Sequence, residues 1–181
     1  NDKINSCHKC QLGDARTKFV FGVGDPKADL LLIGEAPGVD EDRLGEPFVG
    51  RAGKLLDKIL AAIHLNRTKG VYICNVLKCR PPNNRDPLPS EVDQCEPYLQ
   101  HQIRLIKPQL IVALGRVAGK TLLKQDIPLK AMREKIYHYE EIPLIVTYHP
   151  AALLRNSGFK APTWKDFQWI QSILDGKTNI G

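Results

Sequence analysis

Four short runs of Leu, Ile and Val, separated by helix-like segments, constrain this chain more than any other feature. The runs span residues 29–33, 71–74, 110–114 and 144–147. Apart from Asp29 and Thr147 at their ends, these runs are apolar, which is typical of strands buried on both faces of a parallel sheet. The helix-like segments are residues 52–63, 90–106, 116–123 and, after the last run, 164–174. This alternation predicts an α/β fold, a three-layer α/β/α arrangement around a mostly parallel four-stranded sheet.

The ends of these elements carry weaker signals. Ser90 and Asp93 have the spacing of a capping box at the start of the second helix. Residues 135–140 are a candidate for an additional edge strand, whereas Gly22-Val-Gly24 precedes the first run and is interpreted as a loop. Gly115-Arg-Val-Ala-Gly119-Lys-Thr has three residues between its glycines where a phosphate-binding loop has four, so it indicates a turn into a helix.

One globular domain, residues 1–181, accounts for the whole length. A chain of this size with 43% hydrophobic residues can bury one core, and no repeat, low-complexity tract or long linker divides it. No apolar run reaches 18 residues, and the first residues lack the apolar stretch of a secretory signal. We therefore expect a cytoplasmic protein, and we expect it to be a monomer.

Polar residues follow the predicted strands at the points where each strand ends. Glu35 follows the first, Asn75 the second and His149 the fourth, while Gly115-Arg116 follows the third. Ligands of open α/β sheets bind at the carboxyl ends of the strands. Glu35, Asn75 and His149 are therefore expected to be neighbours in one crevice.

The five cysteines indicate a metal or cluster site, because an odd number fits a disulfide framework poorly. Cys7 and Cys10 form a CxxC pair, and Cys79 and Cys95 follow far along the chain. Four thiolates can hold zinc or an iron–sulfur cluster. Structural zinc sites usually use two tight pairs, so the wide spacing favours a cluster. Cys74 lies inside an apolar run and is interpreted as a buried, inert thiol.

Four segments, taken in order, resemble the family 4 uracil-DNA glycosylases. They are Gly34-Glu-Ala-Pro-Gly38, residues 45–53 around Phe48, Asn75-Val-Leu-Lys-Cys79-Arg-Pro-Pro, and Tyr148-His149-Pro150 with the residues up to 156. The resemblance extends from Cys7 to about Arg155. It implies a 4Fe-4S cluster on Cys7, Cys10, Cys79 and Cys95, and hydrolysis of the N-glycosidic bond of deoxyuridine in DNA.

Three residues have the chemistry that an extruded uracil requires. Phe48 can stack on the face of the base, the alternative being a core aromatic. Asn75 offers a donor and an acceptor to N3–H and O4, which the amino group of cytosine would not match; the alternative is a turn-forming Asn. His149 can donate a hydrogen bond to O2 of the departing uracil anion, the alternative being a His that caps the strand end.

The group that positions the attacking water is not identified by the sequence. Related branches of the superfamily have an aspartate one residue before the proline, where this chain has Ala36. Glu35 and Glu41 are the nearby candidates, for the water or for the uracil edge, and backbone groups from Glu35 through Ala36 to Pro37 can also bind the base. Asp40, Asp42 and Glu46 are expected in a solvated loop.

The segment after His149 offers both an apolar wedge, Leu153 and Leu154, and a cation, Arg155, for DNA with a flipped nucleotide. Further candidates for phosphate contacts are Arg80, Arg85, Arg116 and Lys120.

The charge distribution agrees with a DNA partner. The net charge is +6, yet residues 35–46 carry five acids and one base, so the remainder carries +10. A basic body favours a polyanion, with single- or double-stranded uracil-containing DNA as the expected partner. The alternative hypothesis is a non-catalytic iron–sulfur module that binds DNA or transfers electrons. Base release from DNA distinguishes the two.

Overall fold

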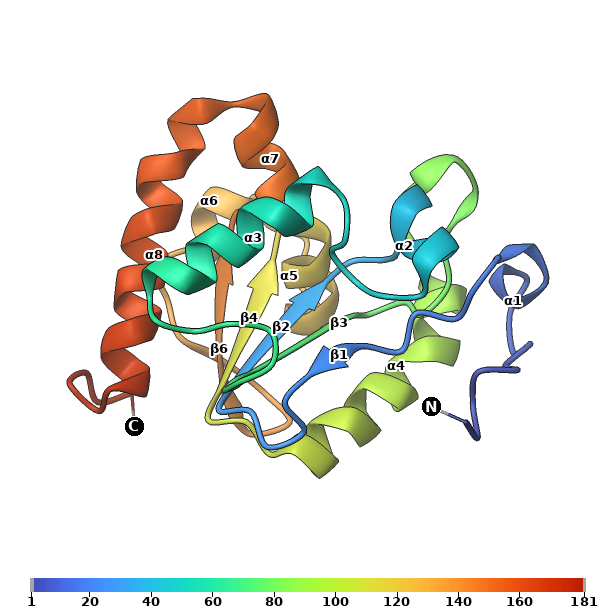
Figure 1. The fold of residues 1–181 in the computed structure, drawn as a ribbon, viewed down its shortest axis with the longest axis horizontal. Helices are drawn as coiled ribbons and strands as arrows, with labels where there is room; N and C mark the ends of the chain where they lie inside the picture. The colour runs from blue at the N-terminus through green and yellow to red at the C-terminus, as the bar shows by residue number, and fades with distance from the viewer. Residues whose placement is uncertain (1, 181) are drawn as a thin grey trace.

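A six-stranded mixed sheet forms the centre of the computed structural model, which describes residues 2–180 (Figure 1). The strands are β1 (Val23–Gly24), β2 (Leu30–Gly34), β3 (Val71–Asn75), β4 (Leu110–Leu114), β5 (Tyr137–Tyr139) and β6 (Ile142–Thr147). Their order is β1-β3-β2-β4-β6-β5. The four central strands are parallel, and the two edge strands β1 and β5 are antiparallel to their neighbours.

The four apolar runs are confirmed as the four parallel strands, but the expectation of a four-stranded sheet was wrong. The candidate edge strand at residues 135–140 is present as β5. Within the predicted loop at residues 22–24, Val23 and Gly24 form β1, which pairs with β3. Two residues, one of them glycine, contain no alternation from which a strand can be predicted.

Helices cover both faces of the sheet. They are α1 (Leu12–Ala15), α2 (Val39–Leu44), α3 (Arg51–Ala62), α4 (Pro89–Ile106), α5 (Arg116–Leu123), α6 (Leu129–Met132), α7 (Pro150–Arg155) and α8 (Lys160–Leu174). Leu31 and Ile33 of β2 point into a core shared with α4 and α5, whereas Leu30 and Leu32 point into a core shared with α3 and α8. Alternate residues of one strand thus serve the two cores, which confirms the three layers.

Helix boundaries differ from expectation where side chains outside the apolar pattern decide them. Helix α4 starts at Pro89, and Glu91, not Ser90 with Asp93, caps it by accepting a hydrogen bond from the Leu88 amide (2.9 Å). Helices α2 and α7 were not predicted, because each has only six residues and too few turns for a helical period. Among residues 2–180, no helix has both the length and the apolar character needed to cross a membrane.

Candidate active site

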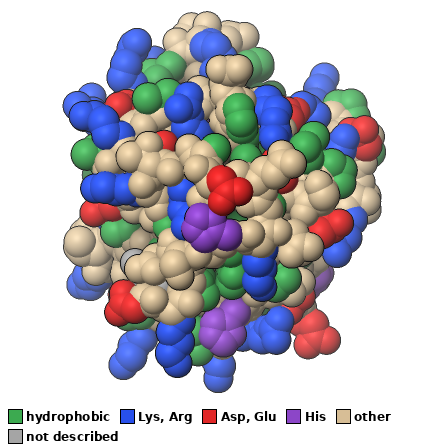
Figure 2. All heavy atoms as spheres, turned by 90° about the vertical axis from the view of Figure 1, so that its right-hand side faces the viewer, with side chains coloured by type: hydrophobic (Ala, Val, Ile, Leu, Met, Phe, Trp, Pro, Cys, Tyr) green, Lys and Arg blue, Asp and Glu red, His purple; other side chains and the backbone are tan. Residues whose placement is uncertain are grey.

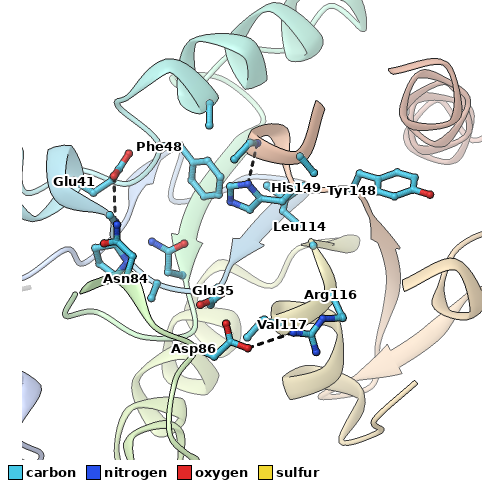
Figure 3. Close-up of a pocket in the computed structure, with 18 of the residues that line it drawn as sticks. Glu35, Glu41, Phe48, Asn84, Asp86, Leu114, Arg116, Val117, Tyr148 and His149 are labelled. Carbon is cyan, nitrogen blue, oxygen red and sulfur yellow. Dashed lines mark hydrogen bonds and ion pairs between the residues drawn. The ribbon is translucent and has the colours of Figure 1, made fainter. Parts of the chain in front are cut away.

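The carboxyl ends of the parallel strands open onto a crevice of about 730 Å³ (Figure 3). Glu35 lies just after β2, Asn75 ends β3, and His149 lies two residues after β6. All three line the crevice, which confirms the prediction that they are neighbours. The register explains their proximity, since Gly34 pairs with Asn75 across β2 and β3.

Asn75 presents its amide to the crevice from a buried position. The residue is 2% exposed, and its side chain forms no hydrogen bond with another residue of the described chain. Gly34 lies directly beside it, because a Cβ at that position would overlap Asn75 Oδ1 and lie 2.6 Å from Phe48 Cζ. The space for both side chains therefore depends on the missing Cβ of Gly34, a contact that the sequence motif alone did not reveal.

Phe48 belongs both to the core and to the crevice. It is 5% exposed and packs among core residues on the α3 side of the sheet, yet it lines the crevice and stacks on His149, with ring centroids 5.3 Å apart (Figure 3). Its backbone is left-handed, with φ of 54°. Arg67 holds this turn by donating hydrogen bonds to the carbonyls of Pro47 (2.8 Å) and Phe48. Nothing in the sequence pattern pointed to Arg67, which lies 19 residues away.

His149 is neutral, and its hydrogen bond determines which nitrogen carries the proton. Its Nδ1 accepts a hydrogen bond from the Ala151 amide (3.0 Å) at the start of α7, so the ring proton is on Nε2. Burial, and then the charge of Arg155, lower its pKa to about 4 against an opposing effect of Glu41. The imidazole therefore presents a neutral N–H donor at physiological pH.

A buried network behind His149 supports the end of β6. Asp166 of α8 accepts hydrogen bonds from Arg133 (2.9 and 2.8 Å) and from the Thr147 hydroxyl. The Arg133 guanidinium also lies 4.8 Å from the ring centroid of Tyr148, which stacks on Phe159. Residues 147 and 148 are thus held on two sides immediately before His149. The sequence analysis missed this network, because its members lie far apart in the chain.

The two candidate carboxylates differ sharply in their surroundings. Burial raises the pKa of Glu35 to about 7, with a further increase from Asp86 and an opposing effect of Arg116. Glu41 instead accepts hydrogen bonds from the amides of Gly38 (3.1 Å) and Val49 (2.9 Å). One oxygen of Glu41 thus holds the loop that carries Phe48 and the other holds the start of α2. The Glu35 side chain has no hydrogen-bond partner among residues 2–180 and faces the crevice (Figure 3).

The acidic segment is only partly a solvated loop. Residues Val39–Leu44 form helix α2. Asp42, expected to be solvated, is buried and accepts hydrogen bonds from the amides of Thr17 (2.9 Å) and Lys18 (3.4 Å). These amides need an acceptor once the N-terminal segment packs there, which is why the charge is buried.

The proposed DNA contacts fall into two groups. Leu154 is 43% exposed and Arg155 lies on the rim of the crevice, whereas Leu153 is 3% exposed and buried. Leu153 therefore cannot serve as a wedge without unfolding α7. Arg116 lines the crevice and pairs with Asp86 (3.3 Å). Arg85 also lines the crevice, where it pairs with Glu91. Arg80 donates to Asn84 and Lys120 pairs with Asp126, and neither of these two cations lines the crevice.

The surface around the N-terminal segment carries charges of both signs. Lys and Arg side chains are spread around the rim of this face, with acidic side chains interspersed (Figure 2).

Cys7, Cys10, Cys79 and Cys95 line one small cavity between the N-terminal segment and α4. None of the cysteines in the described chain forms a disulfide, and Cys74 is buried in β3 as expected. No three His, Cys, Asp or Glu side chains of residues 2–180 are close enough to hold a single metal ion. The four thiols instead surround a shared space.

Hydrogen-bond donors point at three of the four sulfurs. The Tyr98 hydroxyl donates to Cys7 Sγ (3.2 Å), Arg16 Nη1 to Cys79 Sγ (3.6 Å), and the Lys78 amide to Cys95 Sγ (3.3 Å). Burial raises the pKa of Cys79 to about 11 and raises that of Cys95. Bare thiolates are therefore disfavoured here, and the surrounding donors fit sulfurs whose negative charge is stabilised by bound metal.

Known proteins resemble this chain over nearly its whole length. A family model described as the uracil DNA glycosylase superfamily matches residues 21–171. The type-4 uracil-DNA glycosylase of Archaeoglobus fulgidus is 45% identical over 97% of this chain and 92% of its own length. Those of Sulfurisphaera tokodaii and Thermotoga maritima are each 42% identical, over 95% and 86% of this chain and 82% of their own lengths.

Proposed function

This chain belongs to the type-4 group of the uracil-DNA glycosylase superfamily, and we propose that the crevice at the carboxyl ends of β2, β3, β4 and β6 is its active site. The protein is a hydrolase of N-glycosyl bonds that removes uracil from DNA in base excision repair. Hydrolysis of deoxyuridine releases uracil and leaves an abasic site. The observation that carries the assignment is the convergence of Asn75, Phe48 and His149 on one crevice.

Recognition begins with an extruded base, since the glycosidic bond of a stacked base is out of reach. In our proposal the uracil ring stacks beside Phe48, and the backbone of residues 35–37 contacts its rim. The Asn75 amide meets N3–H with its oxygen and O4 with its nitrogen. Cytosine would oppose its amino group to the Asn75 N–H, and an unpaired buried donor costs about 1–3 kcal/mol. This mismatch provides the selectivity for uracil.

Bond cleavage leaves negative charge on uracil and positive charge on the sugar. His149 Nε2–H donates to uracil O2 and stabilises the anion without first acquiring a proton, which its lowered pKa of about 4 would prevent. Its ring is fixed in advance by the Ala151 amide and by Phe48. Such pre-organised donors contribute about 10²–10³-fold to kcat in enzymes where they have been removed.

We assign the attacking water to Glu35 rather than to Glu41. Glu35 faces the crevice with both oxygens free of hydrogen bonds to residues 2–180, and its pKa of about 7 suits a general base near neutral pH. Its carboxylate also opposes the positive charge that develops on the sugar. Glu41 is occupied by backbone amides and holds the Phe48 loop in place.

We further propose that Cys7, Cys10, Cys79 and Cys95 hold a 4Fe-4S cluster. Each iron of such a cluster takes one thiolate, which requires four sulfurs spread around a common centre. The shared cavity and the donors to sulfur support this arrangement. The cluster supplies no step of the hydrolysis. It ties the N-terminal segment to the loop after β3 and to α4.

The DNA strand runs past the rim of the crevice in this proposal. Leu154 is inserted where the flipped nucleotide left the stack, and Arg155 and Arg116 contact phosphates. Single- and double-stranded DNA both satisfy these contacts. One chain supplies the whole crevice, so a monomer suffices.

A glycosylase assay tests the proposal. Wild-type protein incubated with a uracil-containing oligonucleotide and then alkali should cut the strand at uracil. His149→Ala should reduce the single-turnover rate by about 10²–10³-fold, and Asn75→Ala should reduce it while DNA binding is retained. Reversible electron transfer without base release would instead support the non-catalytic iron–sulfur module. Equal rates for the wild type and the two variants would show that the reaction does not take place in this crevice.

A further inference from the structure

Lys78 is a lysine whose side chain is completely buried, at 0% exposure. It lies in the segment between Asn75, which ends β3, and the cysteine ligand Cys79. Its Nζ donates to the carbonyl oxygen of Asn75 (2.8 Å), and its backbone amide donates to Cys95 Sγ (3.3 Å). One residue thus contacts both the strand end of the base pocket and the cysteine cavity.

The positive charge of Lys78 is not balanced by a carboxylate. Among residues 2–180 its ammonium forms no ion pair with Asp or Glu. Other buried charged side chains are compensated, as Arg133 is by Asp166 and Glu91 by Arg85. Since an isolated buried charge is strongly unfavourable, a charged Lys78 needs a counter-charge close by.

Sulfur is the available counter-charge. Cys79 follows Lys78 directly in the chain, and the Lys78 amide lies 3.3 Å from Cys95 Sγ. Two of the four sulfurs that line the cysteine cavity are therefore close to this residue. Four thiolates on a 4Fe-4S core leave a net negative charge in the adjoining cavity. This charge is the negative partner that no carboxylate provides to Lys78.

We propose that Lys78 is the internal counter-ion of the iron–sulfur cluster and, through its hydrogen bond to the Asn75 carbonyl, the positioning residue that connects the cluster to uracil recognition. This inference rests on the proposed cluster and base pocket. The cluster charge holds the ammonium in place, and the ammonium holds the turn on which the Asn75 amide depends. It gives a structural cluster a specific effect on the active site without any redox step.

The test uses three iron-loaded variants: Lys78→Met, which removes charge and donor, Lys78→Gln, which keeps an amide donor without charge, and Lys165→Met, an exposed control on α8. The first measurement is the reduction potential of the cluster by protein-film voltammetry. A neighbouring cation favours the more reduced cluster, so the potential should fall in both Lys78 variants and stay unchanged in the control. Unchanged potentials in folded, iron-loaded Lys78 variants would overturn the counter-ion role.

The second measurement separates the positioning role from general destabilisation. At a temperature where all proteins are folded, kcat for uracil release should fall roughly ten- to hundredfold in Lys78→Met. The kcat of Lys78→Gln should fall less, because a hydrogen-bond donor remains. The KM for DNA should stay near the wild-type value in both variants. A rise in KM alone, or equal losses in both variants, would contradict the link to Asn75.

If neither variant folds, NMR spectroscopy of the wild-type holoenzyme labelled with ¹⁵Nζ-lysine tests the counter-ion role. Lys78 is the buried lysine of the described chain, so its ammonium alone should be protected from exchange with water. That signal should show paramagnetic relaxation from iron. A protected ammonium that relaxes as in a diamagnetic protein would refute the proposal. Wild-type protein without iron or without base release would instead contradict the proposed function itself.

Discussion

The base pocket depends on a residue with no side chain. At Gly34 a methyl group would overlap Asn75 Oδ1 and press against Phe48. We predict that Gly34→Ala lowers kcat/KM by about 10²-fold, because a displacement of about 1 Å in the side chains that position a substrate has an effect of that size. Single-turnover rates at sub-saturating enzyme concentrations measure kcat/KM. Circular dichroism and cluster absorbance should remain those of a folded protein, and a fully active variant would contradict this placement of the pocket.

Glu35 should set the pH dependence of the reaction. With a pKa of about 7, and with its ionised form required, kcat/KM should rise with pH and level off above about pH 7. His149, with a pKa of about 4, stays neutral across that range and adds no second inflection. A pH–rate profile of wild type and Glu35→Gln checks this. The variant should lose most activity and the ascending limb, and a wild-type profile that descends through pH 7 would rule out Glu35 as the base.

The same carboxyl group should affect stability with a definite sign. Its folded-state pKa of about 7 lies above the ordinary value of 4.5, so the native state retains the proton longer than the unfolded state, and ionisation destabilises the fold as pH rises between these values. Glu35→Gln should therefore stabilise the protein increasingly from pH 4.5 to 7. Chemical denaturation across that range gives the comparison.

The polar residues at the strand ends could be predicted, whereas the residues that hold them in position could not. Glu35, Asn75 and His149 follow from strand patterns and the rule for ligand sites of α/β sheets. Arg67, Asp166 and Lys78 act through contacts made only after folding, and no local pattern distinguishes them from ordinary charges. Asp42 shows the same limit, because its burial depends on amides more than 20 residues away.

At the scale of elements, helix α7 combines two leucines with opposite roles. Leu154 is exposed and Leu153 is buried. We predict that Leu154→Ala slows uracil release from duplex DNA with little effect on single strands, where no stack needs a wedge. Leu153→Ala should instead lower the free energy of unfolding by about 2–5 kcal/mol. Rates of uracil release from both substrates, together with denaturant titrations, distinguish the two variants. A Leu153→Ala variant that is stable but slow on duplex DNA, with a destabilised Leu154→Ala variant, would show that α7 is oriented differently.

Long elements were predicted correctly, whereas most short ones were not, with strand β5 as the exception. The four apolar runs and the helices α3, α4, α5 and α8 each contain enough residues to show a period. Strand β1 and helices α2 and α7 contain two to six residues, and neighbouring contacts decide their conformation. The number of strands was therefore underestimated, although the parallel centre of the sheet and the helices on both of its faces were predicted.

At the scale of the whole molecule, we assign the basic residues to the DNA backbone and the acidic segment to the extruded nucleotide. The chain carries +6 overall and −4 in residues 35–46, and the structure places part of that acidic segment beside the crevice. If Arg155 contacts a phosphate, Arg155→Gln should make the slope of log affinity against log salt shallower by about 0.9 for duplex DNA. Binding titrations at several salt concentrations measure this, and an unchanged slope would exclude the contact.

A crystal structure of the protein with uracil bound tests the central claim most directly. We predict that uracil lies beside the Phe48 ring, with the Asn75 amide on its N3 and O4 edge and His149 Nε2 within hydrogen-bond distance of O2. Uracil bound outside this crevice, or bound within it with neither Asn75 nor His149 in contact, would contradict the account.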